Sequence, residues 1–237
     1  MLEYQTKVKL FTIKTRIFDD APKEMSGCDR AYFMLCKKPD SQIEASAYKV
    51  KKVWYTKVDI DRPQDELYAS FNGTTRANIN RGKRALTVKI DDDWDEFKKN
   101  CEEFYKRKGF NSIEIKKREG HFLVTGYQDG KMVEGIYFAV SDETLWSVLI
   151  FSLNELDESY ERICSQASRL CYYRAMIHAR GMGAKSLVNS IGDDIEHPSG
   201  PGKFKLGFGG AQFQRDIYVR DYNPLAKILD KAGIWRA

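Results

Sequence analysis

The feature that most constrains the fold is a run of three strand patterns followed at once by a long helix pattern. The three strand segments are rich in β-branched and aromatic residues, which favour strands, and they occupy 121–127, 131–141 and 144–152. Asp129-Gly130 is typical of a tight hairpin turn, and Ser141-Asp142-Glu143 joins the second strand to the third. The third strand contains the most continuously apolar stretch of the chain, so we expect it at the buried centre of the sheet.

The helix expected over about 158–180 carries small residues on one face, so that face can lie close against a sheet. The residues of this face are Cys164, Ala167, Cys171, Ala175 and His178. Gly181 and Gly183 are expected to end the helix, and Lys185–Ser190 to return as a strand parallel to the third one. This order of elements indicates a mixed α/β protein with one central sheet that changes from antiparallel to parallel.

The remaining patterns complete this outline. We expect strands at 7–18, 30–37, 47–60, 86–90 and 212–219, and helices at 63–84, 93–108 and 224–232. On this basis the chain consists of a β-rich segment, 1–60, which extends the sheet or covers it, and a domain formed by 61–237.

Composition excludes some classes of protein. With 42% hydrophobic residues the chain can form a sizeable core, and the formal net charge of +5 suits an anionic substrate or nucleic acid without requiring either. The five cysteines form no Cys-x-x-Cys pair and the three histidines have no metal-site spacing, so we expect reduced thiols, a cytoplasmic protein and no metal. We find no signal-peptide pattern and no apolar stretch of about 18 residues, so we expect no membrane span.

The stretch Gly200–Gly210 is dense in glycine and holds the pair Phe204-Lys205. Glycines at this density suit tight bends and the close approach of a ligand. We therefore expect Lys205 on a short, open segment, where its ammonium can meet an anion or a developing negative charge. A solvated surface lysine is the alternative.

Three segments in this order resemble the GNAT acyltransferase superfamily, in particular its FemAB-like branch, the aminoacyl ligases of peptidoglycan interpeptide bridges and their smaller single-domain relatives. The segments are Arg76-x-x-Ile79-x-Arg81-Gly82, the helix from Ala167 to Ala184 that leads into Asn189–Gly192, and Phe204-Lys205-x-x-Phe208-Gly209-Gly210. The resemblance implies a GNAT-like, mostly antiparallel sheet flanked by helices. It also implies transfer of an acyl or aminoacyl group to an amine.

The resemblance further implies roles for single residues. Lys205 would steady the tetrahedral intermediate, helped by backbone N–H groups of the nearby glycines, and Tyr172 would act as the acid for the leaving group. Core packing is the alternative for Tyr172, and a solvated basic face is the alternative for the arginines near 76–84. The residues expected to bind substrate are Arg76, Asn80, Arg81, Asn189, Phe204, Gly207 and Gly209.

The donor and acceptor stay open at this stage. The resemblance implies acyl-coenzyme A, but the family's glycine loop for the coenzyme's pyrophosphate is replaced by Ser152–Tyr160, which has no glycine and several acids. Aminoacyl-tRNA is therefore the alternative donor, supported by basic segments such as Lys106-Arg107-Lys108. The expected acceptor is an amine of a cell-envelope or nucleotide-sugar intermediate. A non-catalytic binding module on the same scaffold is the third possibility, and the oligomeric state is not indicated.

Overall fold

The structure, a computed structural model, describes residues 2–8, 11–19, 27–35, 49–107, 110–113, 115, 117–192 and 194–225. By internal contacts the chain divides into two compact units, one formed by 54–104 and 115–213, the other by 1–53, 105–114 and 214–237. The expected division at residue 60 stays a prediction about where the transferase domain begins. The helix expected over 224–232 lies outside the described residues from 226 onward.

The larger unit contains a sheet with the strand order β5-β7-β8-β9-β10-β4. The strands are β5 (Thr87–Ile90), β7 (His121–Gln128), β8 (Lys131–Ser141), β9 (Thr144–Ser152), β10 (Ser186–Gly192) and β4 (Lys49–Asp59), which belongs to this unit from Trp54 onward. All neighbouring pairs are antiparallel except β9 and β10, which are parallel. The expected mixed α/β fold, with β9 inside the sheet, is confirmed.

Two tight turns explain the order of β7, β8 and β9. Asp129 and Gly130 both have positive φ, 50° and 80°, as the expected hairpin turn requires. Asp142 and Glu143 also have positive φ, 49° and 57°. A turn with both central residues in this region matches the twist of the strands it joins.

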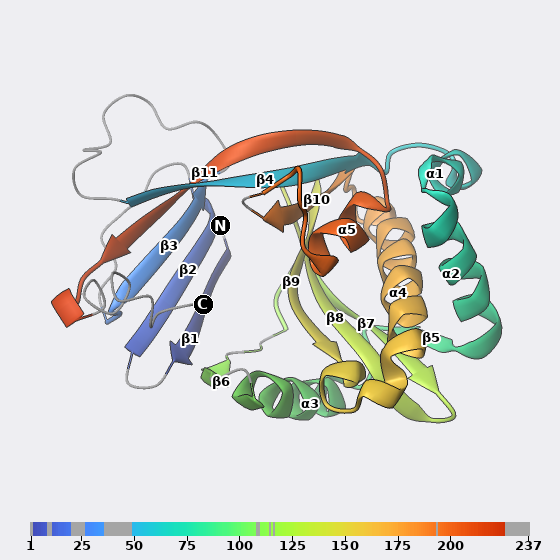
Figure 1. Cartoon of the computed structure of the whole chain (residues 1–237), viewed down its shortest axis with the longest axis horizontal. Coiled ribbons are helices and arrows are strands. Elements are labelled where there is room, and N and C mark those ends of the chain that lie inside the picture. The colour runs from blue at the N-terminus through green and yellow to red at the C-terminus, as the bar shows by residue number, and fades with distance from the viewer. Residues whose placement is uncertain are drawn as a thin grey trace. The chain divides into compact units, whose positions relative to one another are not determined.

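Helices cover both faces of this sheet, as Figure 1 shows. The long helix α4 (Glu161–Gly181) lies on one face, where a Cβ built on Gly126 would be 3.4 Å from Cys171 and 3.5 Å from Ala167. The helix α3 (Trp94–Arg107) lies on the other face, where a Cβ on Gly135 would be 2.5 Å from the ring of Phe97. The expected close fit of the small face of α4 is therefore confirmed.

The helix expected over 63–84 is two helices, α1 (Gln64–Ser70) and α2 (Gly73–Ala85). The break lies at Phe71, whose backbone is extended, and at Asn72, whose side chain accepts a hydrogen bond of 2.8 Å from the N–H of Thr75. An N-cap of this kind favours a new helix start over continuation, so the prediction of one helix was wrong.

The glycine-rich stretch is also more regular than expected. It contains a short helix, α5 (Gly200–Leu206), because Ser199 caps its N-terminus by accepting a hydrogen bond from Gly202 and Pro201 occupies its first turn. The prediction of a short open segment was therefore wrong.

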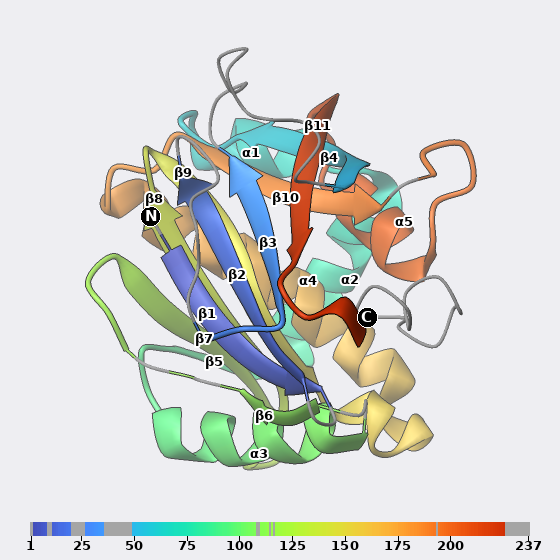
Figure 2. The same ribbon diagram turned by 90° about the vertical axis from the view of Figure 1, so that its left-hand side faces the viewer.

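The smaller unit contains the strand order β11-β3-β2-β1-β6, and Figure 2 shows β1, β2 and β3 side by side. The strands are β1 (Leu2–Val8), β2 (Phe11–Asp19), β3 (Arg30–Leu35), β6 (Phe110–Ile113) and β11 (Ala211–Asp221), which belongs to this unit from Gln214 onward. The strand expected over 7–18 is thus the antiparallel pair β1–β2, and β6 was not predicted. The buried guanidinium of Arg30 donates to the carboxylate of Asp221, which links β3 to β11.

Glu134 on β8 is a buried carboxyl beneath α4, 1% exposed, and it accepts a hydrogen bond of 2.7 Å from the hydroxyl of Ser152. Burial raises the pKa of Glu134 to about 8, although Ser152 and Ser168 oppose the shift through hydrogen bonds. In the unfolded chain the carboxyl titrates near 4.5. Its contribution to stability is therefore fully present below pH 4.5 and is lost as the pH rises towards 8.

Glu134→Gln removes this titration. We expect the variant to be more stable than the wild type by about 1–3 kcal/mol at pH 7.5, with the difference vanishing towards pH 4.5. Urea unfolding at pH 5, 6.5 and 8 measures it, with the exposed Glu102→Gln on α3 as control. A difference that is independent of pH would show that the folded-state pKa of Glu134 is not raised.

Candidate functional site

Lys205, one of the two expected catalytic residues, contacts one of two parallel strands that part. β9 and β10 pair only through Thr144–Trp146 and Ser186–Val188. Beyond these residues β9 continues beside β8 as far as Ser152, while β10 continues beside β4 as far as Gly192. The hydrogen-bonded sheet is therefore interrupted between the two strand ends, a place where ligands can enter an open α/β sheet.

Asn189 is the first side chain of β10 beyond this parting. It is 2% exposed, and its Oδ1 lies 3.5 Å from the hydroxyl of Ser147 on β9, at the outer limit of a hydrogen bond. Its Nδ2 is buried and has no hydrogen-bond partner in the part of the chain that the structure describes. A buried amide donor without a partner is costly, and a ligand acceptor would satisfy it.

Lys205 reaches the same strand from α5. Its Nζ donates a hydrogen bond of 2.8 Å to the carbonyl of Ser190. Desolvation lowers the pKa of Lys205, and no carboxylate of the described residues forms an ion pair with it. The lysine is thus not a solvated surface charge but a half-buried cation at the end of β10.

Phe204 and Tyr172 belong to an aromatic cluster that fixes α5 against α4. The ring of Tyr172 is fully buried, 5.3 Å from Phe204, 5.4 Å from Phe208 and 5.3 Å from Phe138 on β8 (centroid distances). Phe208 in turn packs edge-on against Phe71 after α1. These contacts fit the packing alternative for Tyr172, and its role as an acid stays a prediction.

Arg169 joins this site although the sequence patterns did not single it out. Its guanidinium carbon lies 5.0 Å from the centre of the Phe204 ring, and its Nη1 donates to the backbone carbonyl and the hydroxyl of Ser165, at 2.9 and 2.7 Å. Its Nε is buried without a hydrogen-bond partner among the described residues. The sequence offered only a weak indication of this role, namely that Arg169 lies three residues before Tyr172 and so near the same face of α4.

The glycines around Lys205 act through their size rather than their N–H groups. The N–H of Gly207 donates to the carbonyls of Lys203 and Phe204, and that of Gly209 donates to the carbonyl of Leu206, so these two of the expected donors are already used. A Cβ on Gly207 would lie 2.4 Å from the hydroxyl of Thr75. The glycines allow α5 to pack closely against the start of α2.

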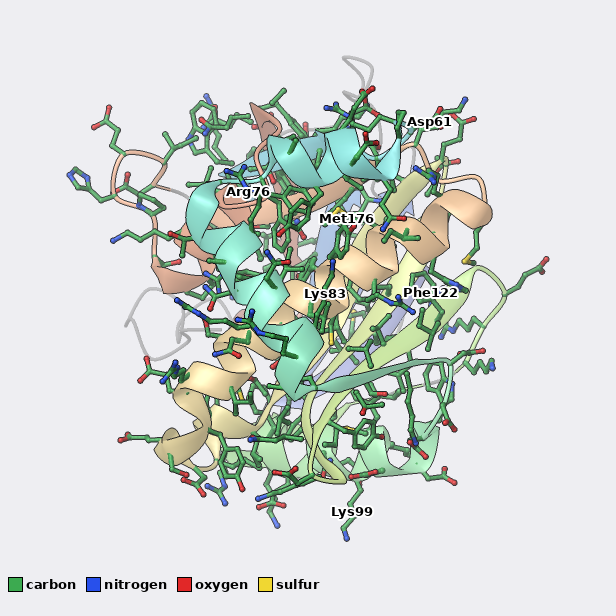
Figure 3. The ribbon with its side chains drawn as sticks, turned by 90° about the vertical axis from the view of Figure 1, so that its right-hand side faces the viewer. Asp61, Arg76, Lys83, Lys99, Phe122 and Met176 are labelled. Atoms are coloured by element: carbon green, nitrogen blue, oxygen red, sulfur yellow. The ribbon has the colours of Figure 1, made fainter. Side chains whose placement is uncertain are left out.

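The other expected ligand-binding residues lie on α2. Nη1 of Arg76 donates to the carbonyls of Ala69 and Phe71, so this guanidinium helps to hold the end of α1. Asn80 and Arg81 are exposed. Figure 3 shows α2 crossing the outside of α4, with Arg76 near the first end of α2 and Lys83 nearer the other.

A pocket of about 490 Å³ lies between the last turn of α2 and the first turns of α4. Its lining includes three arginines, Arg81, Arg84 and Arg162, and no carboxylate. None of the three forms an ion pair within the described ranges. The residues that complete the lining are Ala85, Gln128, Ser159, Tyr160, Ile163 and Gln166. The pocket therefore offers donors to a phosphate-bearing ligand.

Among the described residues there is no group of three or more His, Cys, Asp or Glu that could hold a metal ion. No described helix has the length and apolar character that a membrane crossing needs. Cys101, Cys164 and Cys171 are buried free thiols, and Cys36 lies outside the described residues.

No protein-family model and no curated protein matches the chain. Among solved structures, FemX is similar with 13% identity and a TM-score of 0.55, over 86% of this chain and 75% of that one. L-PGS from Bacillus licheniformis is similar with 12% identity and a TM-score of 0.50, over 85% and 72%. A GCN5-related N-acetyltransferase from Kribbella flavida shares 13% identity over 84% and 70%, with a TM-score of 0.48.

At these identities the likeness concerns the fold. The chain has the GNAT-like, FemAB-related fold that its three sequence segments led us to expect.

Gly210 follows α5 and lies against the backbone of β4. A substitution there tests whether this close contact holds the site in place. Its φ is +95°, and a Cβ built on it would lie 2.4 Å from the carbonyl oxygen of Lys57 on β4. We expect Gly210→Ala to lower the free energy of unfolding by about 2 kcal/mol or more. Gly200→Ala is the matched control, because nothing lies within 4 Å of its Cβ position. Equal stability of both variants in urea unfolding would contradict this account.

Proposed function

We propose that the protein transfers an acyl or aminoacyl group to an amine by direct attack within a ternary complex in the cytoplasm. The observation that carries the proposal is the ammonium of Lys205, held where β9 and β10 part and without a described carboxylate partner. The GNAT-like fold and the Phe204-Lys205 segment support it.

The transfer needs a neutral amine, aligned reactants and a stabilised oxyanion, and none of these requires a nucleophilic side chain. In the proposed mechanism the amine attacks the acyl carbonyl, and the oxygen that gains negative charge is stabilised by Lys205. The unpartnered Nδ2 of Asn189 supplies a second donor on the same strand. The tetrahedral intermediate then expels the leaving group of the donor, a thiolate or an alkoxide, and the proton that the amine loses ends on this leaving group.

Aminoacyl-tRNA and acyl-coenzyme A are the two proposed donors, and one local feature favours the first. The segment between β9 and α4 forms the short 3₁₀ turns Leu153–Glu155 and Glu158–Tyr160, and its Asp157 caps the second turn. This segment has no glycine that would let a pyrophosphate approach the backbone. The pocket of Arg81, Arg84 and Arg162 would instead hold phosphates through side chains.

The proposed acceptor is an amine of a cell-envelope precursor or nucleotide-sugar intermediate. This part of the proposal rests on the resemblance of the three sequence segments to the FemAB-like branch. No side chain described at the site distinguishes one amine from another.

Lys205→Ala is expected to lower kcat about 10²–10³-fold, the usual effect of removing one oxyanion donor. The assay follows transfer of label from ¹⁴C-acetyl-coenzyme A and from a ¹⁴C-aminoacyl-tRNA pool to UDP-linked precursors that carry an amine. Lys203→Ala is the matched control, because Lys203 is exposed on the same helix.

Two outcomes would contradict the proposal. Full transferase activity of Lys205→Ala would remove the assigned role of the lysine. No transfer by the wild type from either donor, together with retained binding of one of them, would identify a non-catalytic binding module.

A further inference from the structure

The pocket of about 490 Å³ between α2 and α4 contains more than its three arginines. Two side-chain amides also line it, those of Gln128 on β7 and Gln166 on α4. Gln166 is only 6% exposed, and neither amide forms a hydrogen bond within the part of the chain that the structure describes. Buried polar side chains are usually hydrogen-bonded. The amide of Gln166 is therefore a buried group at the pocket that a ligand can satisfy.

Close packing of α2 on α4 brings two of the arginines to this amide. A Cβ built on Gly82 would lie 3.2 Å from the backbone carbonyl oxygen of Gln166 and 3.3 Å from the side chain of Leu170. Arg81 precedes Gly82, and Arg84 follows it by two residues. A spacing of three residues places these two arginines near one face of α2. Gly82 thus allows the helices to approach at the point where the arginines meet the pocket.

The lining also has an apolar part. It is formed by the side chains of Ala85 and Ile163 and by the ring of Tyr160. Tyr160 is held from β8, because the Nζ of Lys131 lies 4.4 Å from its ring centre and donates a hydrogen bond of 3.2 Å to its hydroxyl. A restrained aromatic ring beside aliphatic side chains suits the flat face of a nucleobase.

The amides distinguish between classes of anion. Phosphates and polyphosphates accept hydrogen bonds, so they pair well with guanidinium groups but leave the carbonyl oxygen of an amide without a donor. A nucleobase presents donors and acceptors along one edge, and a glutamine amide can pair with both kinds. The volume of about 490 Å³ lies within the range of about 300–1,000 Å³ that small-molecule sites occupy. Guanidiniums, amides and an apolar surface together fit a base linked to phosphate.

We propose that this pocket binds a nucleotide, whose phosphates contact Arg81, Arg84 and Arg162 while the edge of its base pairs with the amide of Gln166. The inference rests on the proposed function, because it takes the nucleotide as a part of the donor or of the acceptor. Lys205 does not line the pocket. The pocket would therefore anchor a substrate through a part that does not react.

Calorimetric titration of the wild type with pyrophosphate, ADP and UDP tests the proposal. We expect one of the two nucleotides to bind about 10-fold or more tightly than pyrophosphate. Arg84→Met should weaken the binding of all three probes about 10- to 100-fold, because a charge-assisted hydrogen bond is lost. Gln166→Leu should weaken only the preferred nucleotide, about 10-fold, and so bring its affinity close to that of pyrophosphate.

Two variants serve as matched controls. Arg174→Met changes an exposed arginine of α4 that does not line the pocket. Gln64→Leu removes an amide of α1 that donates a hydrogen bond of 2.8 Å to the hydroxyl of Tyr173, also outside the pocket. Both controls should bind the three probes as the wild type does.

Three results would overturn the proposal. The first is that the wild type binds none of the three probes, and the second is that it binds pyrophosphate as tightly as both nucleotides. The third is that Gln166→Leu loses pyrophosphate binding and nucleotide binding equally, because the amide would then support the shape of the pocket without contacting a base.

A displacement titration identifies the molecule that carries the nucleotide. The competitors are coenzyme A, a UDP-sugar and a short single-stranded oligoribonucleotide that ends in adenosine. The one that displaces the preferred nucleotide from the wild type names the substrate. If none of them displaces it, the nucleotide is not part of a substrate and the inference as stated is wrong.

The proposed function and this inference can fail separately. Transfer by the wild type that Lys205→Ala loses, together with unchanged nucleotide affinity in Arg84→Met, would leave the proposed function standing and overturn the inference. Nucleotide binding that needs both Arg84 and Gln166, without transfer from any donor, would support the pocket as a nucleotide site and contradict the proposed function.

Discussion

The close packing of α4 on the sheet is the contact on which the site depends. A Cβ built on Gly126 of β7 would already be at contact distance from Ala167 and Cys171, so the helix lies close against β7 and β8. This packing fixes the height and rotation of α4, and with them the positions of Arg169 and Tyr172 on its other sides. A helix held further from the sheet would not bring these two residues against Phe204 of α5.

The aromatic cluster fixes the position of α5 relative to α4. Tyr172 contacts Phe204 and Phe208, and Phe208 contacts Phe71, so α5 is bound to α4 and to the end of α1. Aromatic contacts of this geometry contribute about 0.5–1.5 kcal/mol each beyond the burial of their area. Because Lys205 follows Phe204, the rigid cluster holds an ammonium near β10 that has no described carboxylate to hold it there.

Much of the fold could be predicted from the sequence, because local signals and tertiary packing agree there. Asp129-Gly130 defines the β7–β8 hairpin, and the small face of α4 matches Gly126. The prediction failed where one polar side chain determines where a helix begins. Asn72 caps α2 and so divides the expected single helix into two, and Ser199 caps α5 and so allows the glycine-rich stretch to form a helix. The site was predictable only in part: Asn189 and Lys205 do converge on β10, but Arg169 was missed, since its role depends on a contact with Phe204 across 35 positions of the sequence.

Lys205 is a partly buried cation whose proposed role is to bind an anionic group of a ligand. The most direct measurement is the pKa of its ε-ammonium, obtained by NMR titration of lysine-labelled protein with Lys205→Arg to assign the signal. The account predicts a pKa below the ordinary lysine value of 10.5 in phosphate-free buffer, and a rise when phosphate is added. A pKa at or above the ordinary value that phosphate does not change would contradict it.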